Sequence, residues 1–261
     1  MGKLIINADD YGISHEVNLA IQKGIRERII DRATLMVNMP FAEEAVDMAK
    51  DGGYLNRIGL HINLVEGEPL SYEIKKSWLC SDGYMNGKIS NKKYKTGFIK
   101  DKKALCCIEE EIDAQMQRFL SWGMPLLHVD SHQHSHIKPS IFPIFMKLAK
   151  KYRFTSIRLA ALIQSDNPKF KTKLYKTHVN YQIKKYNKKH YDDKTEFPLI
   201  DIGCSYDSLK KELSNNKSSI TYRNIETWFH PYLENDHIIN LFSKEDFNTI
   251  EMERIKQLVE R

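Results

Sequence analysis

The chain has 261 residues, of which 41% are hydrophobic and 28% charged, and its net charge is +6. This composition is typical of a globular protein with a substantial core, and it excludes a helical membrane protein because no apolar run approaches the roughly 18 residues of a span. Nine lysines and two aspartates lie between Lys169 and Lys194, so one segment carries the whole net charge, whereas a nucleic-acid-binding protein more often spreads a basic stripe over its fold.

Strand and helix patterns alternate in the first part of the chain. The apolar run at 3–8 predicts a buried strand that ends in a polar turn at Asp9 and Asp10. Helical spacing follows after Ser14, which is a candidate N-cap. We expect a second strand at 33–37, a helix at 42–50, and a third strand at 57–63 whose polar face carries His61 and Asn63.

Residues 66–103 show little periodicity, and they predict a long loop of the kind that often has a functional role. A helix is predicted at 104–122, a fourth strand at 126–130, a helix after Pro139 and a fifth strand at 154–159. These patterns continue the alternation of strands and helices.

The basic segment at about 166–198 predicts an insertion, either a surface hairpin or a loosely packed helix. Strands at 199–203 and 225–230 and helices at 205–213 and 245–260 complete the chain. Alternating strands and helices favour a parallel sheet, and we expect a single domain over residues 1–261.

Histidines are concentrated in one short run. Four histidines and Asp130 occupy the even positions from 128 to 136, so in an extended strand all five side chains share one face. Such a face is costly to bury unless water, hydrogen bonds or a metal satisfy it. The alternative is a solvated, histidine-rich loop. Pro125 and Pro139 flank the run closely and favour a strand followed by a loop over a helix.

Polar residues lie at the carboxyl ends of four predicted strands: Asp9 and Asp10, His61, His132, and His230. Ligand sites of parallel barrels and open α/β sheets form at that end. Taken singly, each residue has a simpler explanation, such as a structural histidine or a helix cap. Taken together, they predict a site.

Two histidines and one carboxylate can hold a divalent metal and leave positions open for water or substrate. A metal lowers the pKa of bound water and polarises a carbonyl oxygen. A second carboxylate can accept the proton of the water, and a histidine can protonate a leaving amine. The sequence has no GxSxG, HExxH or P-loop motif. The pattern therefore predicts metal-assisted hydrolysis of an amide or ester.

Five stretches resemble the YdjC-like carbohydrate deacetylase family, which includes chito-oligosaccharide deacetylases. They are IINADDYGIS at 5–14, ATLMVNMPFAEEAV at 33–46, IGLHINLVEGEPL at 58–70, HVDSHQHSHIKP at 128–139 and FHP at 229–231. The resemblance implies a seven-stranded (β/α) barrel of the polysaccharide deacetylase type, with parallel strands and surrounding helices. It also implies removal of an acetyl group from an N-acetylated sugar, a divalent metal, and a homodimer.

The resemblance also implies roles for individual residues. Asp10, His61 and His132 would hold the metal, Asp9 would be the general base and His230 the general acid. The family pattern continues His-Pro-Gly, but here Tyr232 follows Pro231. Supporting or substrate-facing roles would fall to five further polar residues of these stretches: Asn63, His128, Asp130, His134 and His136. Mixed nitrogen and oxygen donors suit several metals, with magnesium or zinc expected first.

Two other functions fit the same sequence. The ligands could serve a metal-dependent hydrolase of another amide or of a phosphoester. The lysines of 169–194 could instead bind nucleic acid or an anionic partner, although a solvated charged face is the simpler interpretation. The four cysteines lack CxxC spacing and no secretory signal opens the chain. We therefore expect reduced thiols and a cytoplasmic protein without a membrane or nucleic-acid partner.

Overall fold

The computed structural model describes residues 2–90, 98–161, 170–192, 195–215 and 222–259. The chain divides into two compact units. The first unit comprises Met1–Asp9, Glu16–Ala33 and Thr155–Arg261, and the second comprises Asp10–His15 and Thr34–Phe154. Strands β1 (Leu4–Tyr11) and β2 (Arg32–Leu35) each pass from one unit into the other. The expectation of a single domain stays a prediction.

Within these described ranges, seven strands form the main sheet, in the order β7-β6-β3-β2-β1-β9-β8. The two end strands are short, since β7 (Ser156–Ile157) has 2 residues and β8 (Ile202–Ser205) has 4. The two end strands do not pair with each other, so the seven-stranded sheet is open. The closed barrel that the sequence predicted is therefore wrong. Short end strands offer few backbone groups for a closing ladder.

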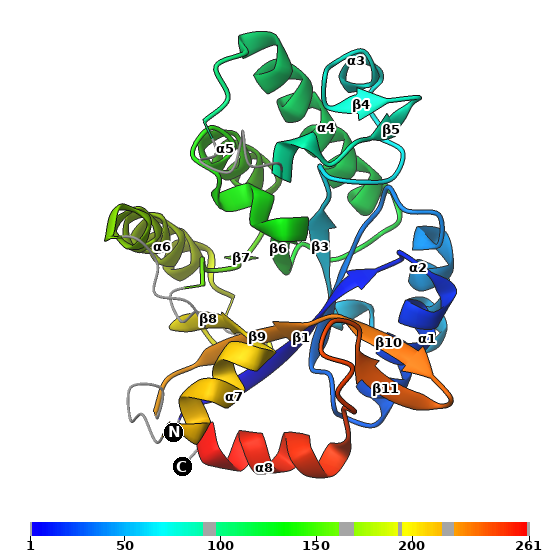
Figure 1. Ribbon diagram of the computed structural model, residues 1–261, viewed down its shortest axis with the longest axis vertical. Helices are drawn as coiled ribbons and strands as arrows, with labels where there is room; N and C mark the ends of the chain where they lie inside the picture. The colour runs from blue at the N-terminus through cyan, green and yellow to red at the C-terminus, as the bar shows by residue number, and fades with distance from the viewer. Residues whose placement is uncertain (1, 91–97, 162–169, 193–194, 216–221, 260–261) are drawn as a thin grey trace. The chain divides into compact units, whose positions relative to one another are not determined.

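In the first unit, β9 (Ile225–Phe229) lies between β1 and β8, and both pairings are parallel. Ala8 of β1 is in register with Phe229, the last residue of β9. Helix α7 (Tyr206–Ser214) packs against β8 and β9. The unit also contains α1 (His15–Arg26), the hairpin of β10 (Pro231–Glu234) and β11 (His237–Asn240), and α8 (Thr249–Val259), as Figure 1 shows.

The basic segment forms a long helix, α6 (Phe170–His190), which also belongs to the first unit. Two buried asparagines of α6 pair with the backbone at 157–160. The Asn187 side chain accepts from the Ile157 N–H at 2.9 Å and donates to the Ile157 carbonyl at 2.8 Å, and Asn180 does the same at Ala160. The helical alternative is thus observed, but α6 is docked by specific hydrogen bonds and is not loosely packed. Residues 162–169 and 193–194 of the predicted insertion lie outside the described residues.

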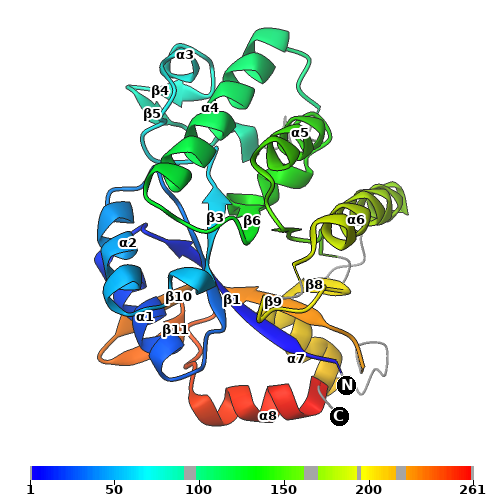
Figure 2. The ribbon, with the colours of Figure 1, turned by 180° about the vertical axis from the view of Figure 1, so that it is seen from behind.

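In the second unit, β3 (Ile58–Ile62) and β6 (His128–Ser131) pair in parallel, with His61 in register with Asp130. Helix α4 (Lys102–Ser121) packs against β3, α3 (Tyr72–Lys75) and α5 (Phe142–Tyr152), as Figure 2 shows from behind. Helix α2 (Ala42–Asp51) and a short turn, η1 (Leu55–Arg57), precede β3. These strands are buried along their whole length, as expected for a sheet covered on both faces.

The predicted long loop contains short elements. After α3 come a hairpin of β4 (Cys80–Ser81) and β5 (Tyr84–Met85) and a turn, η2 (Lys88–Ser90). The buried carboxylate of Glu111 in α4 accepts the N–H groups of Leu70 and Ser71 at 3.1 and 2.7 Å. This part of the loop is therefore fixed to α4. Residues 91–97 of the predicted loop lie outside the described residues.

Strands β3 and β6 approach closely at Gly59. A Cβ atom at this position would lie 2.7 Å from the His128 carbonyl oxygen and 3.0 Å from its Cβ. Real Cβ atoms are not found so close to backbone oxygens, so the approach requires glycine.

The histidine run is extended only up to Ser131. Residues His132–Ile137 form a turn, η4, in which Gln133 and His134 have φ values of 49° and 52°. The alternation of side chains therefore ends at Ser131, and the face that a fully extended run over 128–136 would share does not continue beyond it. The expected order of strand and then loop is confirmed.

None of the helices in the described ranges combines the length and apolar character that a membrane crossing needs. All four cysteines are free thiols, and only Cys106 is exposed.

Candidate active site

Three predicted metal ligands converge in the second unit. Asp10 lies at the end of β1, His61 in β3, and His132 directly after β6. The Asp10 Oδ1 atom lies 2.8 Å from His132 Nδ1 and 3.3 Å from His61 Nε2. One donor atom from each residue lies within 4.8 Å of the others, and all three side chains are buried. We call these residues the Asp-His-His triad.

Asp10 adopts a left-handed backbone conformation, with φ of 65°. Aspartate tolerates this region better than most residues. Burial alone would raise the pKa of the Asp10 carboxyl, but its hydrogen bonds to His132 and His61 hold that pKa well below its usual range. The carboxylate is therefore ionised and available as an oxygen donor.

A second carboxylate orients His61. Asp130 Oδ1 lies 2.5 Å from His61 Nδ1, and Thr34 Oγ1 lies 3.2 Å from the same nitrogen. With Nδ1 engaged by Asp130, Nε2 is the nitrogen that faces Asp10. Metal-binding histidines characteristically bond a carboxylate through the nitrogen that does not face the metal.

The loop after β3 contributes one more carboxylate. Glu66 Oε1 lies 2.9 Å from His132 Nε2. Burial lowers the pKa of His132, but its hydrogen bonds to Asp10 and Glu66 outweigh that effect and raise the pKa to about 9. Glu66 therefore reaches the triad through His132.

The triad fits a divalent metal. It offers one carboxylate oxygen and two imidazole nitrogens from buried side chains at close range, and a further carboxylate fixes one imidazole. Two imidazoles suit zinc and other transition metals better than magnesium, which prefers oxygen donors.

Asn63 shapes the loop that carries Glu66. Its amide donates to the Glu66 carbonyl at 2.7 Å and to Asn38 Oδ1 at 3.1 Å, and its Oδ1 accepts the N–H groups of Val65 and Glu66. These bonds place Asn63 in the support of the triad. A direct contact of Asn63 with substrate stays a prediction.

The remaining histidines of the run lie in different surroundings. His128 is buried at the start of β6, with Nε2 3.8 Å from Asp130 Oδ2. His136 is buried against Phe145, and its Nδ1 lies 2.7 Å from Ser131 Oγ. His134 is partly exposed. Substrate-facing roles for His134 and His136 stay predictions.

Asp9 lies in the first unit and has partners of its own. Arg158 donates to both of its carboxylate oxygens, with both distances 2.8 Å, and Asn7 donates to Oδ1 at 2.8 Å. The Arg158 Nε atom also bonds Glu226 Oε1 at 2.8 Å, and Glu226 pairs with Arg32 at 2.9 Å. Arg158 is fully buried, so these bidentate, charge-assisted bonds fix the Asp9 carboxylate in one orientation.

His230 follows the last residue of β9, and Phe229 is in register with Ala8. This register places His230 at the same strand end as Asp9, within the first unit. The His230 ring is partly exposed and meets the edge of Phe242, with ring centroids 4.6 Å apart.

The family model for YdjC-like proteins matches residues 3–261, which is nearly the whole chain. The chain belongs to the YdjC-like family. This result confirms the family that the five sequence stretches resemble.

Several curated relatives of this YdjC-like chain are named carbohydrate deacetylase. The one from Clostridium beijerinckii is 32% identical over 213 residues, which are 80% of this chain and 79% of that protein. The one from Vibrio campbellii is 28% identical over 92% of this chain and 82% of that protein. The one from Brevibacillus brevis is 40% identical, but the match spans only 57% of that protein and 58% of this chain.

A crystal structure of an Enterococcus faecalis protein assigned to cellobiose-phosphate cleavage is also similar. It has a TM-score of 0.64 and 19% sequence identity, and the alignment covers 100% of this chain and 91% of that one. This likeness shows that the YdjC-like chain shares its fold.

Sequence reasoning missed Arg158 and Glu226 in this YdjC-like protein. The signal for Arg158 was its position inside the short apolar stretch at 154–161, where a charged residue needs a buried partner. Glu226 follows the same rule in β9. No sequence pattern indicates which carboxylate partners which arginine, because the partners lie far apart in the chain.

Proposed function

We propose that this chain is a metal-dependent carbohydrate deacetylase that hydrolyses the acetamide of an N-acetylated sugar, such as a chito-oligosaccharide, and releases acetate. The observation that carries the proposal is the buried Asp-His-His triad, whose His61 is oriented by Asp130. Relatives named carbohydrate deacetylase support the choice of reaction and substrate class.

Asp10, His61 and His132 are the proposed metal ligands. When bound, a divalent metal would supply Lewis acidity toward water and the acetamide oxygen. Zinc suits the two imidazoles, and magnesium is the second candidate.

Asp9 is the proposed general base. Its carboxylate is held by Arg158 and Asn7, and it would accept a proton from the attacking water. The water oxygen forms a bond to the acetamide carbon, and the C–N bond then breaks. General base catalysis contributes about 10²- to 10⁴-fold, which sets the loss expected on removing Asp9.

His230 is the proposed general acid. Asp9 and His230 come directly after a pair of residues that are in register, Ala8 of β1 and Phe229 of β9. His230 would give its proton to the leaving sugar amine. A homodimer and a cytoplasmic location stay predictions.

The test is acetate release from N,N′-diacetylchitobiose by protein loaded with zinc or with magnesium. His132→Ala should abolish metal binding, measured by calorimetry, and turnover together. Asp9→Asn should keep the metal and lose about 10²- to 10⁴-fold in kcat. His15→Ala is the matched control, because His15 is an exposed histidine that pairs with Glu44 and does not belong to the triad.

Full activity of a metal-free His132→Ala protein would contradict the proposal. Hydrolysis of p-nitrophenyl phosphate, with no acetate released from any N-acetyl sugar or other acetamide, would favour the phosphoesterase alternative instead.

A further inference from the structure

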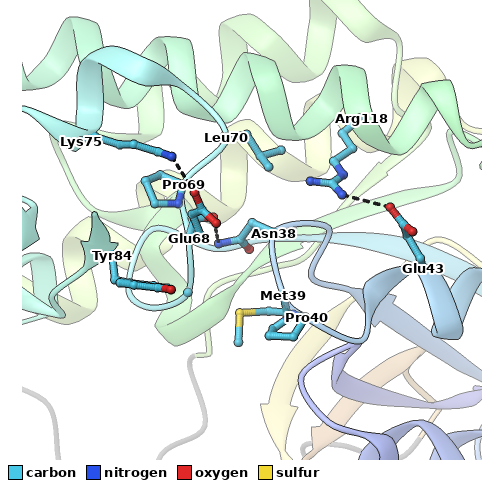
Figure 3. Close-up of a pocket in the computed structure, with 11 residues that line it drawn as sticks. Asn38, Met39, Pro40, Glu43, Glu68, Pro69, Leu70, Lys75, Tyr84 and Arg118 are labelled. Atoms are coloured by element: carbon cyan, nitrogen blue, oxygen red, sulfur yellow. Dashed lines mark hydrogen bonds and ion pairs between the residues drawn. The ribbon is translucent and has the colours of Figure 1, made fainter. Parts of the chain in front are cut away.

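A hollow of about 640 Å³ lies in the second unit beside the loop that carries Glu66. This volume is in the range of small-molecule sites. Its charged and polar lining includes Asn38, Glu43, Glu68, Lys75, Tyr84 and Arg118, as Figure 3 shows. No member of the Asp-His-His triad lines it, so a group bound there is not the group that reacts.

Hydrogen bonds of Asn63 connect the hollow to the triad. Asn63 Nδ2 donates to Asn38 Oδ1 on the hollow side and to the Glu66 carbonyl, and Glu66 in turn contacts His132 at 2.9 Å. The Asn38 amide also lies 3.1 Å from the Glu66 carbonyl. One substrate molecule could therefore occupy both places.

Tyr84 presents an aromatic surface at the hollow. It is 58% exposed, although it sits in a rigid hairpin. The hairpin turns at Asp82 and Gly83 with positive φ values of 52° and 85°, which is typical of a two-residue Asp-Gly turn. The N–H of the next residue, Met85, bonds the Gly67 carbonyl at 2.9 Å. The backbone beside Tyr84 is thus fixed to the loop that carries Glu66.

The charges around the hollow compensate one another. Lys75 pairs with Glu68 at 2.6 Å, and Arg118 pairs with Glu43 at 3.3 Å (Figure 3). The lining therefore offers many hydrogen-bond donors and acceptors without an excess of either charge. An exposed aromatic ring beside such groups suits a pyranose ring, which has apolar C–H faces and an equatorial rim of hydroxyls.

We propose that this hollow binds the sugar next to the acetylated one, with Tyr84 stacking on that ring, and so makes the enzyme selective for oligosaccharides over monosaccharides. This inference rests on the proposed deacetylase function and adds the determinant of chain length. Tyr84 and Arg118 line the hollow and lie outside the triad, so they would act on substrate selection and not on the reacting group.

The test compares kcat/KM for N,N′-diacetylchitobiose and for N-acetylglucosamine, measured by acetate release. The wild type should favour the disaccharide, and Tyr84→Ala should lower the disaccharide-to-monosaccharide ratio about tenfold, which corresponds to about 1.4 kcal/mol. Tyr84→Phe keeps the ring and should stay within about twofold of the wild type. Tyr72→Ala is the matched control, because Tyr72 is a similarly exposed tyrosine of the same loop outside the hollow.

A wild-type enzyme without preference for the disaccharide, or an equal ratio in Tyr84→Ala and Tyr72→Ala, would overturn the inference and leave the deacetylase function standing. If the wild type released no acetate from either sugar, the proposed function would fail, and binding of chitobiose, which needs no turnover, would test the hollow alone. Saturation-transfer NMR should then show chitobiose binding that Tyr84→Ala removes and Tyr72→Ala keeps; equal binding by both variants would overturn the inference.

Discussion

Asp9 and Asp10 are consecutive residues with separate partners: Arg158 and Asn7 hold the first, and His61 and His132 contact the second. The family resemblance implies different roles for the two residues, and these roles stay predictions. The sequence could not predict Arg158, because the pairing depends on residues about 150 positions apart. Polar residues near strand ends are visible in a sequence, but their buried counter-charges are not.

Asp130 should control metal affinity through His61. Asp130→Ala removes the carboxylate at His61 Nδ1, and we expect metal affinity to fall about 10- to 100-fold, as for comparable supporting residues. Asp130→Asn keeps an oxygen acceptor without the charge and should lose less. Competition with a chelator measures both, on protein whose folding is checked by circular dichroism.

Asp113→Ala is the control for the Asp130 variants, since Asp113 pairs with Lys151 on the surface of α4. Equal affinity in Asp130→Ala and Asp113→Ala would show that Asp130 does not orient His61.

At the scale of elements, the alternation of strands and helices predicted the order of the elements and the parallel sheet, whereas the closed barrel that the family resemblance implied is wrong. Periodicity described α6 and the loop after β3 poorly, because α6 is basic on most of its faces and the loop elements are only two to four residues long. What fixes both segments is a buried polar side chain: Asn180 and Asn187 for α6, and Glu111 for the loop.

The α6 asparagines should support the proposed base at a distance. Each makes two hydrogen bonds to the backbone beside Arg158, and Asn187→Ala leaves buried backbone groups without these partners at a cost of about 1–3 kcal/mol. We expect kcat to fall, with KM and metal affinity unchanged, when activity is measured well below the melting temperature. Tyr181→Ala, on the exposed side of the same helix, should leave kcat as in the wild type. A drop in stability without any change in kcat would limit the asparagines to a structural role.

Glu111 should make stability depend on pH. Burial raises the pKa of Glu111 above 4.5, although hydrogen bonds from Gln115, Ser71 and Leu70 oppose the shift. The folded protein therefore binds more protons than the unfolded chain above pH 4.5, and the free energy of unfolding falls as pH rises from there through the folded-state pKa. Glu111→Gln should remove this decline, as measured by urea unfolding at a series of pH values.

The exposed neighbour Glu110 provides the control, since Glu110→Gln should retain the wild-type decline. An identical pH dependence in the Glu111→Gln protein would show that this carboxyl does not carry the effect.

At the scale of the whole molecule, the sequence predicted a seven-stranded α/β protein, and the sheet has seven strands but is open. Closure of the sheet into a barrel depends on the length of the two end strands. These strands have only two and four residues, and the sequence does not indicate the length of strands this short. The net charge of +6 is likewise a property of one helix and its flanks. A docked helix with an exposed basic face favours a solvated surface over a nucleic-acid site.

The basic face of α6 should therefore be dispensable for activity. Changing Lys184, Lys185, Lys188 and Lys189, all exposed, to glutamine should leave acetate release within about twofold of the wild type. The wild type should show no salt-sensitive DNA or RNA binding in a filter assay. Tight binding that falls steeply with salt and is lost in the quadruple variant would revive the nucleic-acid alternative.

Gly59 links the sheet to the chemistry two residues further along β3. Because a Cβ at position 59 would meet the His128 carbonyl, any missense change there pushes apart the two strands that bring His61 and Asp130 into register. In evolutionary terms, a position without a side chain is then constrained as strictly as a ligand. A mutational scan read out by metal retention should find Gly59 among the intolerant positions, although it contributes no atom to the metal.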